Sequence, residues 1–412
     1  STMDIKISPS TLKGKVKIPA SKSYVHRMLI CAALSNGISE IKDISFSKDI
    51  SATISSLTEL GADFETYKNT VAVRGIESPC GKAVIDCCES GSTLRFIIPI
   101  AAAFGVNAQF IGEGRLPHRP IDIYIRELSA KGIKFDYNNT MPFNICGQLH
   151  GGTFALEGDV SSQFVTGLLF ALPLLKENSE IVLTSPLESK PYADMTIECL
   201  KKFGVEVSET ENGYKINGNQ QYKPYNASVE GDYSQAAFFY TANALGSNVE
   251  ISGLNPNSVQ GDRKILEIID LMCYNKSCLG SFKADCKDIP DLVPILAVLG
   301  CFGNDTSEIY NAQRLRIKES DRLQSVSDML NKLGGNVTVK EDGLVIEPVR
   351  TLHGGVVDSC GDHRIAMCAA IAALRADGDV IIQGAESVEK SYPNFFEDYN
   401  NLGGKASVII ME

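Results

Sequence analysis

The sequence has no long apolar run, and this absence excludes a membrane-spanning helix. Its longest apolar stretches, such as residues 96–104, are far shorter than the roughly 20 residues that cross a bilayer. No apolar segment typical of a secretory signal peptide follows the N-terminus. We therefore expect a cytoplasmic protein.

The sequence also lacks any C-x-x-C pair, although it contains twelve cysteines and five histidines. The cysteines are scattered, and several fall within apolar helical stretches, for example Cys31, Cys199 and Cys368. Buried free thiols in a reducing cytosol account for this pattern better than a disulfide framework does. With so few and such dispersed histidines, we expect no metal centre.

The sequence has fewer basic than acidic residues, 39 against 50, so that its formal net charge is −11 at pH 7. This argues against a nucleic-acid binder that relies on a broad basic surface. It leaves room for small anionic ligands, because a few concentrated cations can make a positive pocket in an acidic protein. A chain of 412 residues with 44% hydrophobic residues is expected to form two globular domains.

Internal repeats organise the chain. Amphipathic helical patterns end in glycines that are 71, 72, 130 and 69 residues apart, namely Gly61, Gly132, Gly204, Gly334 and Gly403. The double gap holds one degenerate copy at residues 265–272. Glycine at each exit is typical of a left-handed helix cap.

A second kind of helix, apolar on nearly all sides, precedes each amphipathic one. These helices are expected at residues 25–34, 94–104, 164–175, 236–245, 292–299 and 365–374, and they should be buried. With the short alternating strands, the repeat reads βαβαββ. The prediction is an α/β fold of two three-repeat domains, at residues 19–227 and at residues 3–18 plus 228–412.

The starts of the buried helices carry hydroxyls and cations. Ser21-Lys22-Ser23 opens the first helix, and Glu89-Ser90-Gly91 opens the second without the spacing of a P-loop. N-capping explains each hydroxyl singly, but a cation beside free N–H groups also makes an anion site. After the second helix, two prolines are expected to present either Arg115 or Arg119.

Acidic groups join the later helix starts. Asp288 or Asp291 could be an N-cap or a general base. In the stretch 313–322, Lys318 and Arg322 would share a face of one helix, with Ser320 or Asp321 as its cap. If the helix starts converge on an inter-domain cleft, its cations would be Lys22, Arg27, Arg95, Arg119, Lys318, Arg322, Arg364 and Lys390. Such a site suits strongly anionic substrates and acid–base chemistry.

Taken in order, these motifs resemble the 5-enolpyruvylshikimate-3-phosphate synthase family over essentially the whole chain. The stretches that carry the resemblance are Ser21-Lys22-Ser23 with Arg27, Ser161-Ser162-Gln163, Ser189-Lys190-Pro191-Tyr192, Val229-Glu230-Gly231-Asp232, Ile289-Pro290-Asp291, Lys318-Glu319-Ser320-Asp321-Arg322, Asp362-His363-Arg364-Ile365-Ala366-Met367 and Lys390-Ser391-Tyr392-Pro393.

The resemblance implies an enolpyruvyl transferase fold, in which the N-termini of the buried helices face an inter-domain cleft. It also implies transfer of the enolpyruvyl group of phosphoenolpyruvate to the 5-hydroxyl of shikimate 3-phosphate, with release of phosphate. This reaction lies on the pathway to chorismate and the aromatic amino acids, and the family is the target of the herbicide glyphosate. We expect a monomer that needs no cofactor, metal, nucleic acid or membrane.

The resemblance further implies the site residues. Shikimate 3-phosphate would be bound by Lys22, Ser23, Arg27, Ser161, Ser162, Gln163, Ser189, Tyr192, Asp291, Arg314 and Lys318. Phosphoenolpyruvate would be bound by Lys22, Gly91, Arg119, Gln163, Glu319, Arg322, Arg364 and Lys390. Asp291 would accept the hydroxyl proton, while Lys22 and Glu319 are candidates for proton transfer at the methylene carbon. His363 would assist, or would have a structural role beside Arg364.

Two positions depart from the family pattern. Glu89 stands where asparagine is usual, and Arg314 where relatives often have a neutral residue. One alternative is enolpyruvyl transfer to UDP-N-acetylglucosamine, but the loop 112–120 lacks the reactive cysteine which that reaction needs. The other is a non-catalytic anion-binding relative, against which the net acidity and the complete set of acid–base residues count.

Overall fold

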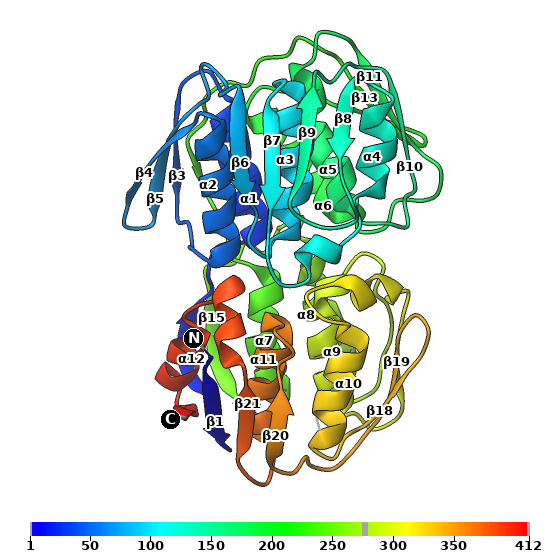
Figure 1. Cartoon of the computed structure of the whole chain (residues 1–412). Coiled ribbons are helices and arrows are strands. Elements are labelled where there is room, and N and C mark those ends of the chain that lie inside the picture. The colour runs from blue at the N-terminus through cyan, green and yellow to red at the C-terminus, as the bar shows by residue number, and fades with distance from the viewer. Residues whose placement is uncertain (1, 274–278, 410–412) are drawn as a thin grey trace. The chain divides into compact units, whose positions relative to one another are not determined.

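The computed structural model describes residues 2–273 and 279–409. The chain divides into two compact units (Figure 1). The central unit is Ala20–Glu230, and the terminal unit combines Ser1–Pro19 with Gly231–Glu412. The chain therefore starts in the terminal unit, builds the central unit, and then returns.

The central unit contains three four-stranded sheets with one shared topology. Their strand orders are β14-β3-β5-β4, β6-β7-β9-β8 and β10-β11-β13-β12. In each sheet the first pair is parallel and the other two pairs are antiparallel. The strands are β3 (Ile38–Lys42), β4 (Asp63–Tyr67), β5 (Thr70–Arg74), β6 (Lys82–Asp86), β7 (Asn107–Ile111), β8 (Ile133–Asp136), β9 (Phe143–Gly147), β10 (Thr153–Leu156), β11 (Ser179–Leu183), β12 (Ser208–Thr210), β13 (Gly213–Ile216) and β14 (Ala227–Ser228).

The terminal unit repeats this topology in the sheets β16-β17-β19-β18 and β20-β21-β1-β22, and adds the parallel pair β15-β2. Its strands are β1 (Asp4–Ser8), β2 (Lys13–Lys17), β15 (Asn248–Ser252), β16 (Lys283–Asp285), β17 (Ser307–Tyr310), β18 (Asn336–Val339), β19 (Leu344–Glu347), β20 (Gly355–Asp358), β21 (Val380–Gln383) and β22 (Lys405–Ile409).

Three strands pair away from their neighbours in sequence. β2 leads the chain out of the terminal unit but pairs with β15, and β14 leads it out of the central unit but pairs with β3. Each unit thus takes the first strand of one repeat from the segment through which the chain leaves it. The third strand is β1. It lies between β21 and β22 in the sheet of the final repeat, the position that β5 has in the sheet of the first repeat.

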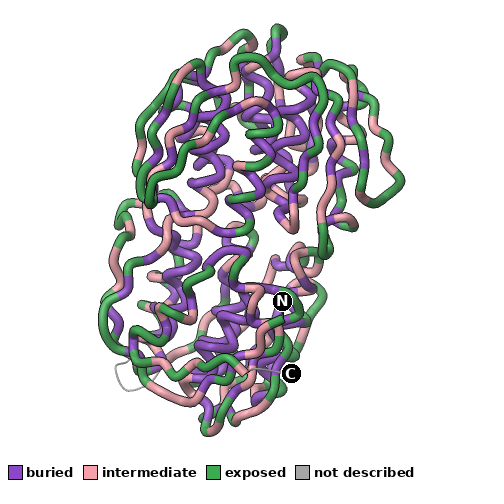
Figure 2. The backbone as a smooth tube through the Cα atoms, turned by 60° about the vertical axis from the view of Figure 1, so that its left-hand side comes forward, coloured by how far each residue is buried: buried purple, intermediate pink, exposed green. Residues whose placement is uncertain are grey.

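Two kinds of helix alternate along the chain, as the sequence predicts. The inner helices are buried on nearly all sides and form the core of each unit, seen as the purple interior of Figure 2: α1 (Lys22–Leu34), α3 (Gly91–Ala103), α5 (Ser162–Ala171), α7 (Tyr233–Ala244), α9 (Val293–Gly300) and α11 (His363–Ala372). The outer, amphipathic helices are α2 (Lys48–Leu60), α4 (Asp122–Ser129), α6 (Lys190–Lys202), α8 (Ile265–Met272), α10 (Arg322–Lys332) and α12 (Phe395–Asn401).

Glycine ends the outer helices where the repeat pattern placed it. Gly61 caps α2 with φ of 118°, a left-handed conformation that side chains with a Cβ rarely adopt. The four corresponding residues also have positive φ: Gly132, Gly204, Gly334 and Gly403. The regular spacing of these glycines therefore correctly predicted where the outer helices end.

Short 3-10 helices connect several elements, and three of the predicted site residues lie in them, namely Asp291, Arg314 and Lys390. These helices are η1 (Leu116–His118), η2 (Leu172–Leu174), η3 (Gly261–Lys264), η4 (Pro290–Leu292), η5 (Gln313–Ile317), η6 (Ala373–Arg375) and η7 (Ala385–Lys390). The eleven cysteines that the structure describes are free thiols, as expected, while Cys278 lies outside the described residues. Within the described ranges, no helix is both long and apolar enough to cross a membrane.

Candidate active site

Serine side chains cap the three inner helices of the central unit. Ser21 accepts from the Tyr24 N–H at 3.3 Å, Ser90 from Thr93 at 3.1 Å and Ser161 from Gln163 at 3.2 Å. The capping interpretation of these hydroxyls is therefore correct for one residue of each motif. The other polar side chains of each motif are not used for capping. Anion binding at these helix starts is therefore still possible.

Lys22 begins α1 and forms an ion pair with a residue that the sequence did not single out. Its Nζ lies 2.9 Å from Asp49 Oδ2, and the Asp49 side chain is 6% exposed. Asp49 follows the N-cap Ser47 in the first turn of α2, a position that favours acidic residues for the helix dipole alone. The sequence therefore offered no reason to prefer an active-site role for it.

Arg27 draws together residues that were predicted to bind one substrate. Its guanidinium donates to Thr196 Oγ1 at 2.9 Å, to the Ser23 carbonyl at 3.0 Å and to the Tyr192 carbonyl at 3.3 Å. The guanidinium also lies over the Phe96 and Tyr192 rings, at 5.3 and 5.8 Å from their centroids. Burial lowers the pKa of Arg27 to about 10. Ser23, Arg27 and Tyr192 thus form one group, to which Thr196 adds a residue missed from the sequence.

Gln163 is fixed from two sides. Its Oε1 accepts from Arg95 Nη1 at 2.8 Å, and its Nε2 donates to Ser92 Oγ at 2.8 Å. Arg95 also lies 4.9 Å from the centroid of the Phe164 ring and is 2% exposed. Arg95 therefore joins α3 to α5, which is a structural role for a cation that the sequence placed in the cleft.

Arg119, rather than Arg115, is the arginine that meets the start of α3. A Cβ added to Gly91 would lie 2.6 Å from Arg119 Nη1, so a larger residue at this position would displace the guanidinium. Arg119 is 8% exposed, whereas Arg115 is exposed. The carboxylate of Glu89 approaches the backbone at Gly114, where a Cβ would lie 2.1 Å from its Oε1.

Ser189 is the N-cap residue of α6 and is almost completely buried. Its φ of 56° is left-handed, which is uncommon for a residue with a Cβ, and its side chain makes no capping hydrogen bond. Backbone strain of this kind persists where the surroundings impose it, often at functional sites.

Arg322 is the centre of the cluster in the terminal unit. Its Nε lies 2.9 Å from Asp362 Oδ2, its Nη1 lies 3.3 Å from Asp291 Oδ1, and its Nη2 contacts Glu319. Burial alone would lower the pKa of Arg322, but the three carboxylates together raise it. The guanidinium is therefore held permanently charged in a site that is 2% exposed.

Asp291 bridges two arginines. Besides Arg322, it contacts Arg364, whose Nη2 lies 3.4 Å from Asp291 Oδ2 and 3.4 Å from Ser234 Oγ. The capping interpretation of Asp291 is wrong, because no side chain caps η4 or α9. Nε and Nη1 of Arg364 are buried and have no hydrogen-bond partner among the described residues. Donors of this kind are costly to bury unless a ligand accepts from them.

Glu319 and His363 complete this cluster. Glu319 Oε1 lies 3.5 Å from Lys390 Nζ, and both side chains are largely buried. His363 contacts Arg322 Nη2 at 3.3 Å through Nε2 and contacts Ser391 Oγ through Nδ1. The histidine side chain therefore joins Arg322 and Ser391, and its structural role beside Arg364 stays a prediction.

Glu319, Asp362 and His363 also have the geometry of a possible metal site, with one ligand atom of each within 4.8 Å of the others. Each of the three side chains already contacts the Arg322 guanidinium. These three side chains therefore surround the guanidinium of Arg322, which occupies the place of a metal ion.

One prediction about the stretch 313–322 is wrong. Lys318 and Arg322 do not share a helix face, because η5 ends at Ile317 and α10 begins at Arg322. Lys318 has an extended backbone, with ψ of −152°, and precedes the helix. Asp321 is the cap of α10, accepting from the Gln324 N–H at 3.3 Å.

Arg314 binds the protein itself. Its Nη2 donates to the Lys287 carbonyl at 2.7 Å, which ties η5 to the segment that leads to Asp291. Arg314 can therefore help to position the segment that carries Asp291, the predicted base.

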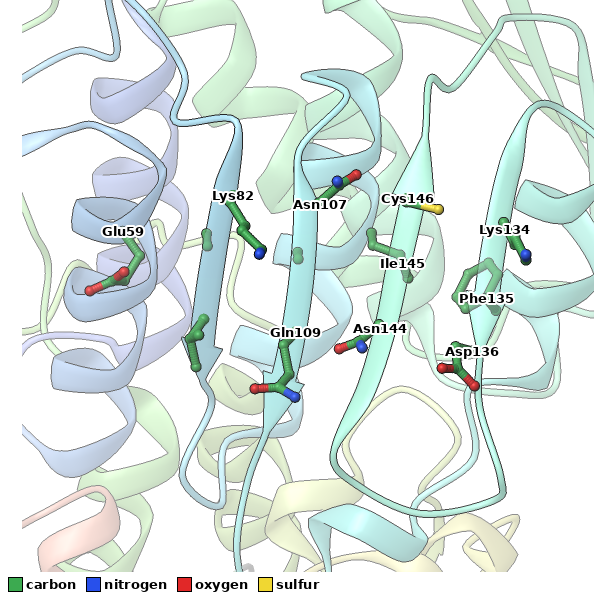
Figure 3. Close-up of a pocket in the computed structure, with 13 residues that line it drawn as sticks. Glu59, Lys82, Asn107, Gln109, Lys134, Phe135, Asp136, Asn144, Ile145 and Cys146 are labelled. Carbon is green, nitrogen blue, oxygen red and sulfur yellow. The ribbon is translucent and has the colours of Figure 1, made fainter.

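A separate groove lies on the outer face of the sheet β6-β7-β9-β8 (Figure 3). Its volume is about 930 Å³, and Glu59 of α2 closes one side. The strands present amide, charged and apolar side chains to it, including Lys82, Gln109, Asn144 and Asp136. None of the predicted site residues lines this groove.

Comparisons with known proteins point to one family. The family profile described as EPSP synthase (3-phosphoshikimate 1-carboxyvinyltransferase) matches residues 7–399. Among curated relatives, the 3-phosphoshikimate 1-carboxyvinyltransferases of Clostridium novyi and Clostridioides difficile are each 45% identical to this chain, covering 97% of it and 98% of the relative. A solved EPSP synthase from Acinetobacter baumannii superimposes with a TM-score of 0.82 at 25% identity, covering 99% of this chain and 100% of that chain.

Proposed function

The chain belongs to the EPSP synthase family, and from this premise we propose which of its residues bind the substrates and carry the reaction. The enzyme transfers the enolpyruvyl group of phosphoenolpyruvate to the 5-hydroxyl of shikimate 3-phosphate. The products are 5-enolpyruvylshikimate 3-phosphate and inorganic phosphate. Transfer to UDP-N-acetylglucosamine is not favoured.

We propose that shikimate 3-phosphate is bound by hydroxyls and charged side chains, among them the group that Arg27 forms with Ser23 and Tyr192. The residues in the central unit are Lys22, Ser23, Arg27, Ser161, Ser162, Gln163, Ser189 and Tyr192, and those in the terminal unit are Asp291, Arg314 and Lys318. The hydrogen bonds from Arg27 to Ser23 and Tyr192 support this grouping. Hydroxyls and backbone N–H groups at helix starts are suited to phosphate oxygens.

For phosphoenolpyruvate, the proposed residues of the central unit are Lys22, Gly91, Arg119 and Gln163, and those of the terminal unit are Glu319, Arg322, Arg364 and Lys390. The observation that carries most weight is the pair of buried N–H donors on Arg364. A carboxylate or phosphate oxygen would satisfy them with charge-assisted hydrogen bonds. The close approach of Arg119 to Gly91 gives the central unit a comparable cation.

We propose that Asp291 is the general base. The oxygen of the 5-hydroxyl attacks C2 of phosphoenolpyruvate while its proton passes to Asp291 and C3 gains a proton. In the second step C3 loses a proton and the C2–O bond to phosphate breaks. Two arginines hold Asp291 at distances of 3.3 and 3.4 Å, which favours its ionised form as the base.

The protons at C3 are assigned to Lys22 and Glu319, with assistance from His363. Both proposed carriers have an opposite charge beside them: Asp49 at 2.9 Å from Lys22 and Lys390 at 3.5 Å from Glu319. Such partners hold each side chain in position. His363 contacts Arg322 and therefore acts by positioning that guanidinium.

We also infer a cytoplasmic monomer. The free thiols of the described cysteines agree with a reducing compartment. Every proposed ligand of the two substrates is supplied by one chain, so that the reaction itself requires no second copy.

Asp291→Asn tests the assignment of the base. The amide keeps the shape of the side chain but accepts no proton, so kcat should fall about 100-fold or more while KM for both substrates stays within about threefold. Asp288→Asn is the matched control, because Asp288 lies three residues earlier and contacts neither arginine among the described residues. Unchanged turnover in Asp291→Asn would remove Asp291 as the base.

A further inference from the structure

Four buried polar side chains form a hydrogen-bonded chain through the apolar core of the central unit. They are His26 on α1, Thr53 on α2, and Thr93 and Ser90 at the start of α3, and none is more than 1% exposed. His26 Nδ1 lies 2.8 Å from Thr53 Oγ1, which lies 2.8 Å from Thr93 Oγ1. Thr93 Oγ1 donates to Ser90 Oγ at 2.7 Å. We call this group the histidine–hydroxyl chain.

The direction of every hydrogen bond in the histidine–hydroxyl chain follows from its last member. A threonine hydroxyl has a single proton, and Thr93 gives its proton to Ser90. Thr53 must therefore donate to Thr93, and His26 must donate to Thr53 through Nδ1–H. The protonated nitrogen of His26 is thus fixed by hydroxyls on two other helices.

One end of the histidine–hydroxyl chain sets the start of α3. Ser90 Oγ also accepts the backbone N–H of Thr93 at 3.1 Å and is the cap of this helix. The next residue, Gly91, is the one against which the Arg119 guanidinium packs. A shift of the cap would therefore move the surface that positions Arg119.

The other end aligns α1 with α2. Lys22 and His26 are four residues apart on α1, as Asp49 and Thr53 are on α2. Residues at this spacing lie on one face of a helix. The ion pair Lys22–Asp49 and the hydrogen bond His26–Thr53 are therefore consecutive contacts between the same two helices, at 2.9 and 2.8 Å.

We propose that His26 is a positioning residue for enolpyruvyl transfer, which acts through Thr53, Thr93 and Ser90 to hold Gly91 and Arg119 in the geometry that binds phosphoenolpyruvate. This inference rests on the proposed assignment of phosphoenolpyruvate to Gly91 and Arg119. It adds a residue that touches neither substrate, and it explains why a polar chain crosses a core where apolar side chains would pack at no cost of desolvation.

Paired substitutions separate positioning from simple loss of packing. His26→Asn keeps an N–H at the place of Nδ1, and Thr53→Ser keeps the hydroxyl. By contrast, His26→Gln moves the N–H away and Thr53→Val removes the hydroxyl without changing the shape. The second pair should raise KM for phosphoenolpyruvate about tenfold, the scale of one buried hydrogen bond, and the first pair less than about threefold.

The Michaelis constant for shikimate 3-phosphate should change less than that for phosphoenolpyruvate, by about twofold at most, because Gly91 and Arg119 are assigned to phosphoenolpyruvate alone. Ser56→Ala is the matched control, since Ser56 is a fully buried hydroxyl of α2 whose one hydrogen bond within the described residues is to Ala52 O at 2.7 Å. It should leave both KM values unchanged. Equal rises in both KM values, without rescue by Asn or Ser, would overturn the proposal.

Two further measurements distinguish this inference from the assignment on which it rests. Gly91→Ala places a Cβ 2.6 Å from Arg119 Nη1 and should itself raise KM for phosphoenolpyruvate. If it does not, the assignment of phosphoenolpyruvate is wrong. If it does but His26→Gln and Thr53→Val do not, His26 has no positioning role. Nitrogen-15 NMR of the wild-type enzyme should find Nδ1 of His26 protonated, and an unprotonated Nδ1 would overturn the direction of the chain.

Discussion

Asp291 and Arg322 show how single residues are given their roles by their partners. The carboxylate of Asp291 contacts two guanidinium groups, and Arg322 contacts three carboxylates. Each charge is thereby paired in a site where an unpaired charge would cost several kcal/mol. Chemistry that needs both a base and bound anions is possible here because acidic and basic groups alternate in space.

Asp262 is a further carboxylate near Arg364, and it provides a prediction at this scale. It is 4% exposed, and its Oδ1 has no hydrogen-bond partner among the described residues. Burial raises the pKa of Asp262 well above its ordinary value of 3.8, the charge of Asp291 raises it further, and Arg364 opposes the rise. The folded enzyme therefore keeps a proton that the unfolded chain releases above that value.

Since only the unfolded state gains from ionisation, the contribution of Asp262 to stability falls as the pH rises from about 4. Asp262→Asn removes this loss, and it should stabilise the enzyme by at least about 1 kcal/mol at pH 8. The difference should shrink toward pH 4. Thermal unfolding of both proteins at pH 4, 6 and 8 measures it, and a variant that is less stable than wild type at pH 8 would show that Asp262 is ionised.

The sequence named the residues of the proposed site but not their contacts. Arg322, Glu319 and Asp291 were given separate roles, whereas the structure joins them in one ion-pair cluster. Asp49 and Thr196 were missed because an acidic residue in a first helical turn and a threonine within a helix are both ordinary. Their meaning comes from tertiary contacts with Lys22 and Arg27.

At the scale of elements, the stretch 313–322 divides its two carboxylates between different tasks. Asp321 caps α10 and also contacts Arg316 at 3.2 Å, while Glu319 contacts Arg322 and Lys390. The sequence left the cap open between Ser320 and Asp321. The structure assigns it to Asp321 and gives the Ser320 hydroxyl to Asp362 at 2.8 Å.

Asp321→Ala should therefore reduce the free energy of unfolding by about 1 kcal/mol, the usual value of an N-cap. Both KM values and kcat should remain within about twofold of wild type. Glu319→Gln should instead lower kcat well beyond that range. Denaturant unfolding and steady-state kinetics of the two variants test this, and a loss of turnover in Asp321→Ala as large as in Glu319→Gln would contradict it.

Helix identity was predictable because it depends on local pattern. Nearly uniform apolar stretches became inner helices, and glycine-terminated amphipathic stretches became outer ones.

One kind of turn follows the first strand of three repeats. In it an aspartate Oδ1 accepts the N–H two residues later: Asp86–Cys88, Asp285–Lys287 and Asp358–Cys360. The extended backbone at Lys318 was not predictable, since helix propensity alone continues through it.

At the scale of the whole molecule, strand pairing departs from chain order. Periodicity reveals that a strand exists, but the partner of an edge strand depends on where the chain travels next. β2 precedes the first repeat in sequence but pairs with β15 of the fourth, whereas β14 precedes the fourth repeat but pairs with β3 of the first. β1 pairs with β21 and β22 almost 400 residues later in sequence. Six repeats can therefore be counted from sequence, although the strands of three of them cannot be assigned.

A fragment comprising residues 20–230 should fold by itself. All three of its sheets are complete within that range, and one continuous apolar core runs through it. Thermal unfolding followed by circular dichroism should show one cooperative transition. A shorter fragment, 20–224, lacks β14 and should melt at a lower temperature. The absence of a cooperative transition in fragment 20–230 would contradict the division into two units.

The most direct test of the central claim is phosphate release from phosphoenolpyruvate by the full chain. With shikimate 3-phosphate as acceptor, we expect one phosphate for each enolpyruvyl ether formed. With UDP-N-acetylglucosamine, phosphate should not exceed the background without acceptor. Folded enzyme that releases no phosphate with shikimate 3-phosphate, or releases it with the nucleotide sugar instead, would contradict the assigned reaction.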